Sequence, residues 1–219
     1  SPARNEREPV AGRDVYLTID AELQEIAERA MDDAITEYQA SGGDVVILDP
    51  STGELLALAS RQTMDGTVIT NKASFFTDPF QPGSTAKLFT AAALLARHRV
   101  DSTDAVFAEN GVWEMSVTSR GDTRIIHDAH KTTGNLTLAQ AIQVSSNIAM
   151  AKFSQRLSAL EQFEALRDFG FGSPTGVEYP SESRGGLRPP EKWDGYSKAS
   201  IAMGYEFLVT PIQLAAAYA

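Results

Sequence analysis

The first regular pattern of apolar positions lies near the N-terminus. Residues 14–19, DVYLTI, alternate between polar and apolar side chains, which predicts a short strand. Asp20 then precedes apolar residues at helical spacing over 23–38, which predicts a capped amphipathic helix that the glycine pair 42–43 should end. The polar, proline-containing residues 1–13 lack any such pattern, so we expect a linker there and a folded domain over 14–219.

Two short apolar runs follow the predicted helix. VVILD (45–49) and ELLALAS (54–60) flank the sequence Pro-Ser-Thr-Gly at 50–53. Proline, serine and glycine are the residues that tight turns prefer, so this arrangement predicts an antiparallel hairpin.

Helical spacing dominates the middle of the chain. Between 82 and 202 most apolar runs fit helices, except for a short hairpin predicted within 112–126. Thr210 and Pro211 open a further predicted helix, which is still in progress at Ala219. Because only two or three strands precede the helices, we expect the covering sheet to need additional strands beyond Ala219.

Composition narrows the function classes. The chain has 219 residues, of which 42% are hydrophobic, enough for one sizeable core. A net charge of -10 and a pI near 4.8, without a cluster of Lys and Arg, argue against a nucleic-acid partner. The longest apolar run, Leu88–Ala96, is about half of the roughly 20 residues that span a bilayer.

Cofactor and metal chemistry find little support in the sequence. The chain has no cysteine, which excludes disulfides, thiol nucleophiles and Cys-ligated zinc. His127, Asp128 and His130 lie close together, but their spacing matches no standard zinc site. We therefore expect a polar loop there, with no bound metal and no cofactor.

Ser84 and Lys87 form the first candidate catalytic pair. Of the six lysines, Lys87 is the one with a serine three residues before it, and that serine follows Pro-Gly and opens an apolar run. Side chains at i and i+3 share a helix face, so the Lys87 amine can reach the Ser84 hydroxyl. Burial and the helix dipole both favour a neutral amine that accepts a proton. The alternative is a structural N-cap serine beside a structural lysine.

A second candidate pair lies 61 residues further on, at Ser145 and Asn147. A hydroxyl and a carboxamide on a tight connection between helices can pass a proton and hold a peptide group. The alternative is that both side chains only cap helices.

The two pairs together resemble a known enzyme family. Serine acyl-enzymes of the penicillin-binding type carry Ser-x-x-Lys, Ser-x-Asn and Lys-Thr-Gly in that order, and the first two are present here in order. The chain is similar, from about Gly12 to Ala219, to the transpeptidase domain of class B penicillin-binding proteins, in the septal division branch. The segments that carry the resemblance are GRDVYLTIDAELQ, ILDPSTGELLALAS, FQPGSTAK, GNLTLAQAIQVSSNIAM, FGFGSPTGVEYPSE and VTPIQLAAAYA.

The resemblance implies a fold and a reaction. The fold would be α+β, of the penicillin-binding and β-lactamase type: an antiparallel sheet packed with helices, plus an all-helical subdomain, with the last sheet strands missing. Ser84 would be acylated by the terminal D-Ala-D-Ala of a peptidoglycan stem peptide, with Lys87 as its base. Ser145 would relay a proton to the leaving amine, and Asn147 would orient the peptide.

The sequence departs from the family pattern in three ways. Gln81 stands where the family commonly has Glu, and Ala86 stands where it commonly has a bulky residue, and neither change removes a catalytic group. No Lys-Thr-Gly occurs; Lys-Thr-Thr-Gly at 131–134 precedes Ser-x-Asn, whereas the family triplet follows it. We expect that triplet beyond Ala219, and therefore little or no activity from the 219 residues alone.

Two classes of alternative function share this resemblance. A D-alanyl carboxypeptidase or serine β-lactamase would give the acyl group to water, and a non-catalytic scaffold domain would only bind division partners. The expected ligands are peptidoglycan stem peptides and β-lactams, and the expected partners are a membrane glycan polymerase and division proteins. The expected location is the periplasm or the outer face of the bacterial cytoplasmic membrane, with an anchor N-terminal to this sequence.

Overall fold

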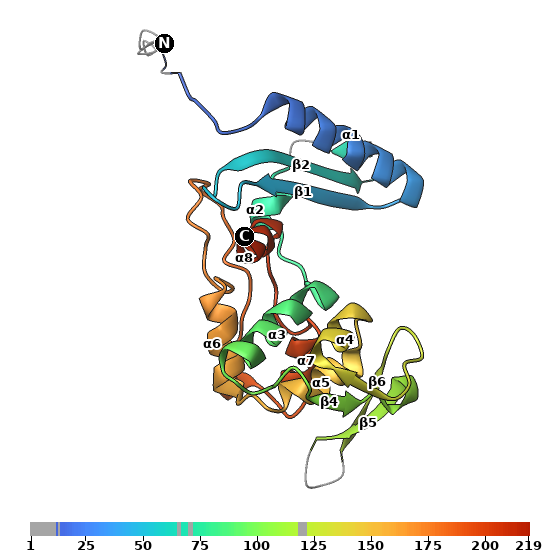
Figure 1. Ribbon diagram of the computed structural model, residues 1–219. Coiled ribbons are helices and arrows are strands. Elements are labelled where there is room, and N and C mark those ends of the chain that lie inside the picture. The colour runs from blue at the N-terminus through green and yellow to red at the C-terminus, as the bar shows by residue number, and fades with distance from the viewer. Residues whose placement is uncertain (1–11, 13, 65–66, 70–71, 118–121) are drawn as a thin grey trace, which may run out of the picture.

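A three-stranded antiparallel sheet forms one end of the molecule and a group of helices forms the other (Figure 1). The computed structural model describes residues 12, 14–64, 67–69, 72–117 and 122–219. Most of the expected linker, residues 1–11 and 13, lies outside the described residues. The α+β architecture expected from the sequence is confirmed.

The N-terminal helix α1 spans Ala21–Tyr38 and is capped by Asp20, whose carboxylate accepts hydrogen bonds from the first-turn backbone N–H groups. The strand expected over 14–19 is wrong. Those residues form no regular element, and Val15, Tyr16 and Leu17 are 81%, 91% and 75% exposed. An alternating pattern produces a strand only where a neighbouring strand pairs with it, and the described chain provides none at this segment.

The hairpin is confirmed. Strand β1 (Gly42–Leu48) pairs antiparallel with β2 (Leu55–Met64), and β2 pairs with the short β3 (Thr67–Ile69). The glycine pair 42–43 was expected to end α1, but it opens β1 instead. Helix α1 already ends at Tyr38, and Gln39 after it adopts a left-handed conformation.

Alternation along the hairpin divides its side chains between two layers. One face packs on α1 through Val45, Ile47, Ala57 and Ala59. The other face contacts α2 (Ser74–Thr77) and α8 (Pro211–Tyr218), and places Val46 and Leu58 against Phe75, Phe76 and Ile212. The sheet is thus covered by helices on both faces, as Figure 1 shows.

The second part of the molecule is mainly helical. Helix α3 (Lys87–Ala96) and helix α5 (Asn147–Ser154) run through its centre, surrounded by three further helices. These are α4 (Leu138–Gln143), α6 (Ala159–Asp168) and α7 (Ser197–Ala202). Short 3-10 turns lie at Gly83–Ala86 (η1), Glu109–Gly111 (η2) and Pro190–Lys192 (η3).

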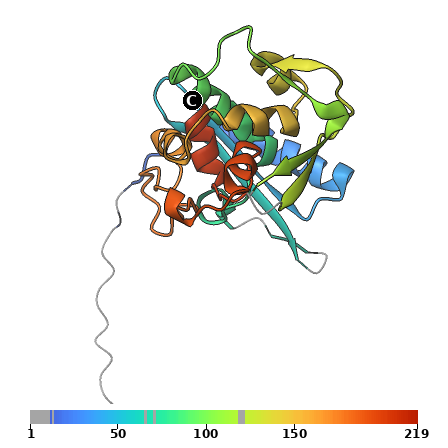
Figure 2. The same ribbon diagram turned by 90° about the horizontal axis from the view of Figure 1, so that it is seen from below.

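This helical part is not all-helical, because it also carries two short antiparallel strand pairs. β4 (Ala105–Phe107) pairs with β7 (Asn135–Thr137), and β5 (Val112–Ser116) pairs with β6 (Thr123–His127). The second pair confirms the hairpin predicted within 112–126. Seen from below, this hairpin and α6 lie on opposite sides of the helical part (Figure 2).

The two parts meet at η1 and α8. The backbone of Phe80, just before η1, bridges Val209, just before α8. Helix α8 begins as expected, with Thr210 and Gln213 forming a reciprocal capping box around Pro211. None of the helices in the described part of the chain combines the length and the apolar character that a bilayer span requires.

Candidate active site

Ser84 lies in the 3-10 turn η1, which runs directly into α3. The residue before it, Gly83, has φ 57°, a left-handed conformation that glycine adopts without steric cost. The Ser84 carbonyl accepts the Lys87 backbone N–H, so both residues belong to one helical turn. The side chains differ in environment: Ser84 is exposed, whereas Lys87 is 2% exposed. The serine therefore faces solvent and the lysine lies behind it.

Gly204 contacts the backbone of this turn, and the sequence analysis did not identify it as a site residue. The Gly83 N–H donates to the Gly204 carbonyl at 3.0 Å. A Cβ atom on Gly204 would lie 1.8 Å from the Gly83 oxygen, so no other residue fits. Gly204 follows α7 with φ 88°, as helix-ending glycines do, so the sequence could indicate a helix end there. The contact with Gly83 has no such local signal, because Gly83 lies about 120 residues away.

The Lys87 amine is buried and points towards the Ser145 turn. Its Nζ donates to the Ser145 carbonyl at 2.6 Å and lies 3.0 Å from Ser145 Oγ. Ser84, which also lies within the described residues, is not a hydrogen-bond partner of this amine. Desolvation lowers the pKa of Lys87 from 10.5 to about 8, against the opposing field of Asp128, which raises it. With a pKa of about 8, roughly one amine in ten is neutral at pH 7, and the neutral fraction rises with pH.

The turn 144–146 connects α4 to α5 and places Ser145 opposite Lys87. The Ser145 and Ser146 N–H groups donate to Ile142 and Ala141, which is the two-bond pattern that commonly ends a helix. Ser145 sits at the position where glycine is usual and has φ 53°. A serine held in a left-handed conformation stores strain of the kind found at functional sites.

Asn147 begins α5 on the far side of the same turn. Its Nδ2 donates to the His127 carbonyl at 2.9 Å, which fixes the amide and leaves Oδ1 free to accept. Ser146, fully buried, caps α5 by accepting the Ala149 N–H. The structure thus brings Lys87, Ser145 and Asn147 together beside the turn that carries Ser84.

Of the three residues weighed as metal ligands, His127 ends β6, and Asp128 and His130 lie in the loop that follows. The described residues contain no group of three or more His, Asp or Glu side chains placed to bind a metal. The Asp128 carboxylate instead accepts from Ser146 Oγ and from the Ile148 N–H. Lys131, in the Lys-Thr-Thr-Gly segment of this loop, is exposed and packs its backbone against Gly111.

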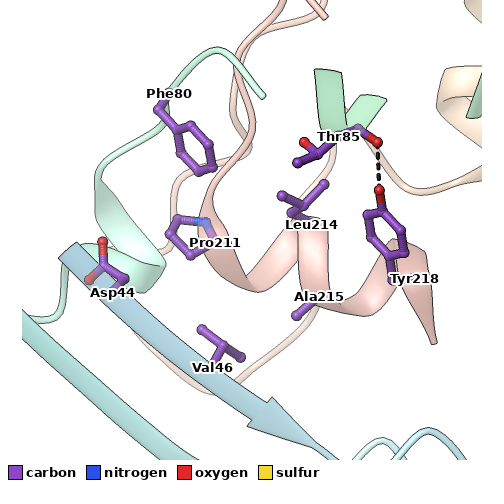
Figure 3. A pocket seen from close by; sticks show the side chains of 8 residues that line it. All are labelled: Asp44, Val46, Phe80, Thr85, Pro211, Leu214, Ala215 and Tyr218. Carbon is purple, nitrogen blue, oxygen red and sulfur yellow. Dashed lines mark hydrogen bonds between the residues drawn. The ribbon is translucent and has the colours of Figure 1, made fainter. Parts of the chain in front are cut away.

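A cavity of about 560 Å³ is lined by Thr85, the residue that follows Ser84 in η1 (Figure 3). Its walls come from β1, α8 and Thr85, and the Tyr218 hydroxyl donates to the Thr85 carbonyl at its rim. None of Ser84, Lys87, Ser145 and Asn147 lines it. We therefore place the candidate active site at the Lys87–Ser145 contact and not in this cavity.

Comparison with known proteins identifies the family. Residues 43–219 match the family model described as the penicillin binding protein transpeptidase domain. The chain belongs to this family. The resemblance to class B transpeptidase domains noted from the sequence is confirmed.

The similar proteins agree with this family. The chain is 34% identical, over 219 residues, to the probable peptidoglycan D,D-transpeptidase PbpC of Pseudomonas aeruginosa, and covers 37% of that protein. It matches a crystal structure of a peptidoglycan glycosyltransferase from Burkholderia ambifaria with a TM-score of 0.82, at 32% identity, over 93% of this chain and 60% of that one. The transpeptidase domain of Burkholderia pseudomallei penicillin-binding protein 3 gives a TM-score of 0.80, at 31% identity, over 92% and 56% of the two chains. The transpeptidase domain described here thus spans about a third of the length of the curated relative.

Proposed function

We propose that this domain is a serine D,D-transpeptidase that cross-links peptidoglycan stem peptides through an acyl-enzyme at Ser84. One observation carries the proposal: the buried Lys87 amine, adjacent in the fold to the turn of Ser84, hydrogen-bonds to Ser145 of the Ser-x-Asn motif. Two motifs 61 residues apart in the sequence thereby form one site. The family match supports the reaction type.

In the first half-reaction Ser84 Oγ attacks the carbonyl between the two terminal D-alanines, and its proton passes to Lys87. A neutral amine has two N–H groups and one lone pair. The two contacts to Ser145 use both N–H groups, which leaves the lone pair for the Ser84 proton. The backbone N–H groups of the first helical turn, with the helix dipole, stabilise the oxyanion that forms.

The first half-reaction ends when the bond to the terminal D-alanine breaks and the leaving amine takes a proton through Ser145 Oγ, which leaves the acyl-enzyme. In the second half-reaction the amine of a second stem peptide attacks the Ser84 ester, forms the new peptide bond and returns a proton to the serine oxygen. Asn147 Oδ1 accepts a peptide N–H of the bound stem, because its Nδ2 is already held by His127. Both steps use groups that the turn 144–147 holds in place.

Transfer to water is the competing outcome on this fold, in a D-alanyl carboxypeptidase or a β-lactamase. The two are separated by the lifetime of the acyl-enzyme, since a transpeptidase stays blocked by penicillin and a β-lactamase releases it. A non-catalytic scaffold is disfavoured by the buried lysine, because burying an ionisable amine costs free energy that a scaffold has no reason to retain.

The test is the intact mass of the full-length protein after exposure to a penicillin. We expect the added mass of one opened β-lactam on the peptide that carries Ser84, persisting for longer than one turnover of a β-lactamase. The Ser84→Ala variant is the control and should gain no mass. Labelling of that variant at the same rate would disprove the nucleophile assignment.

The cellular setting follows from the same proposal. We place the domain in the periplasm or on the outer face of the cytoplasmic membrane, where peptidoglycan lies, in a protein anchored by a segment N-terminal to this sequence. A membrane glycan polymerase and division proteins are the proposed partners, and the structural similarity to a protein described as a peptidoglycan glycosyltransferase supports the polymerase. Co-purification of the full-length protein with a polymerase from membranes tests this association.

A further inference from the structure

Asp128 occupies the point where the loop after β6 meets the Ser-x-Asn turn. Its Oδ2 accepts from Ser146 Oγ at 2.8 Å, and its Oδ1 accepts from the Ile148 N–H at 3.0 Å. Its own backbone N–H is tied to the Gly111 carbonyl at 3.1 Å. The backbone of Asp128 is therefore fixed by a hydrogen bond, and both oxygens of its carboxylate accept hydrogen bonds.

The two bonds from Asp128 reach the middle residue of the motif and the first turn of the helix behind it. Ser146 is 1% exposed, and its single hydroxyl proton goes to Asp128 while its oxygen accepts the Ala149 N–H at 3.0 Å. Two otherwise unpaired N–H groups of α5, those of Ile148 and Ala149, thus depend on one carboxylate, directly and through a serine.

The neighbouring residue extends the same attachment. The His127 carbonyl accepts Asn147 Nδ2 at 2.9 Å. Residues 127 and 128 together hold Ser146, Asn147 and Ile148, while Ser145, the remaining residue of the motif, faces Lys87. Residues 127 and 128 thus form a clamp that holds residues 146–148, the part of the turn that Lys87 does not contact.

We propose, building on the transpeptidase function proposed above, that Asp128 is a positioning residue that holds Ser145 and Asn147 in register with Lys87. It touches no substrate in this role and acts through Ser146 and the first turn of α5. Deleting it should leave the nucleophile in place and loosen the proton-transfer side of the site.

The charge of Asp128 gives this role a second, separable effect. Among the described residues, Asp128 is the charged group whose field acts on Lys87, and it raises the Lys87 pKa against the larger effect of desolvation. Removing the charge lowers that pKa, so the pH at which acylation reaches half its maximum should fall. Loss of position reduces the maximal rate, whereas loss of charge moves the midpoint, and the two effects can be measured apart.

The experiment compares two variants of the full-length protein. Asp128→Asn keeps the size of the side chain and removes its charge; Ser146→Ala removes the bond to Asp128 and keeps the charge. Acylation by a fluorescent penicillin is followed from about pH 6 to 10, with the Lys87 side-chain titration measured by NMR on the same samples. We expect both variants to lose at least about tenfold in maximal rate, as for a lost hydrogen bond to a charged group. The midpoint should fall for Asp128→Asn and stay unchanged for Ser146→Ala.

Wild-type rates in both variants, or an Asp128→Asn midpoint and Lys87 titration equal to the wild type, would overturn the proposal. If Asp128→Asn does not unfold cooperatively, the result for Ser146→Ala decides between the outcomes. A wild-type maximal rate of acylation in Ser146→Ala overturns the proposal. A reduced maximal rate with an unchanged pH midpoint supports it. If the wild type itself is not acylated, the transpeptidase function fails. The NMR titration of Lys87 and hydrogen exchange at Ile148 and Ala149 then still decide whether Asp128 holds the turn, because neither requires activity.

Discussion

Gly83 and Gly204 lie in direct backbone contact beneath the candidate nucleophile. The Gly83 N–H donates to the Gly204 carbonyl at 3.0 Å, and a Cβ on Gly204 would lie 1.8 Å from the Gly83 oxygen. The turn that carries Ser84 is therefore held by a segment far away in the sequence, and its position depends on the absence of one side chain.

Replacement of Gly204 by alanine should therefore displace the Ser84 turn. The new methyl group meets backbone, which cannot rotate away, so we expect a loss of more than about 3 kcal/mol in the free energy of unfolding and no detectable acylation. The matched control is Gly176→Ala. Gly176 has φ 89°, close to the 88° of Gly204, but nothing lies within 4 Å of its Cβ position. That variant should lose only about 1 kcal/mol, from backbone strain. Urea unfolding measures both, and equal losses would show that the contact is unimportant.

The base assignment predicts that Lys87→Arg loses acylation almost as fully as Lys87→Ala. Arginine keeps the charge but does not release its proton at ordinary pH. General bases contribute on the order of a hundredfold to ten-thousandfold in rate, so both variants should slow by at least about a hundredfold. For the wild type, the rate should rise with pH and level off above about 8, the pKa of Lys87. Stopped-flow acylation measures each rate, and an active arginine variant would show that Lys87 acts only as a positive charge.

The same pKa predicts that Lys87 destabilises the folded protein near neutral pH. Burial lowers its pKa from 10.5 to about 8. Below pH 8 both the folded and unfolded states carry the proton and the full cost is present. Between pH 8 and 10.5 the unfolded state alone keeps it, so stability rises with pH. Lys87→Met should therefore be more stable than the wild type at pH 7, by up to about 3 kcal/mol, with a gap that narrows above pH 8. Urea unfolding across this range tests the prediction, and a gap independent of pH would contradict it.

Strain at Ser145 predicts opposite effects on stability and activity. Ser145 has φ 53°, where glycine carries no steric cost. Ser145→Gly and Ser145→Ala both remove the hydroxyl, but only glycine also relieves the strain. We expect the glycine variant to be about 1 kcal/mol more stable than the alanine variant.

Both Ser145 variants should be acylated by penicillin more slowly than the wild type, because the nitrogen released when the β-lactam ring opens also needs a proton, and both should lose peptide cross-linking in a stem-peptide assay. Loss of activity in the glycine variant, which is the more stable of the two, distinguishes a proton relay from a purely structural residue. Wild-type cross-linking by either variant would remove Ser145 from the proposed mechanism.

Local sequence determined the elements and the chemistry-bearing pairs. The capped helix after Asp20, the hairpin around 50–53 and the helix opened by Thr210 and Pro211 all appear as expected, because caps, turns and apolar spacing act within a few residues. Ser84 and Lys87 share a turn for the same reason: a spacing of three residues fixes their proximity without help from the rest of the chain.

Tertiary structure decided what those elements contact. Alternation at 14–19 predicted a strand, but pairing needs a neighbouring edge that the sequence of the segment cannot specify. Lys87 was expected to reach Ser84, and the fold instead directs its amine to Ser145, 58 residues away. The clamp by Asp128 and the requirement for Gly204 arise only when distant backbones meet. Spacing along the chain fixes which residues share a helical turn, whereas burial, strain and long-range hydrogen bonds exist only once separate segments pack together.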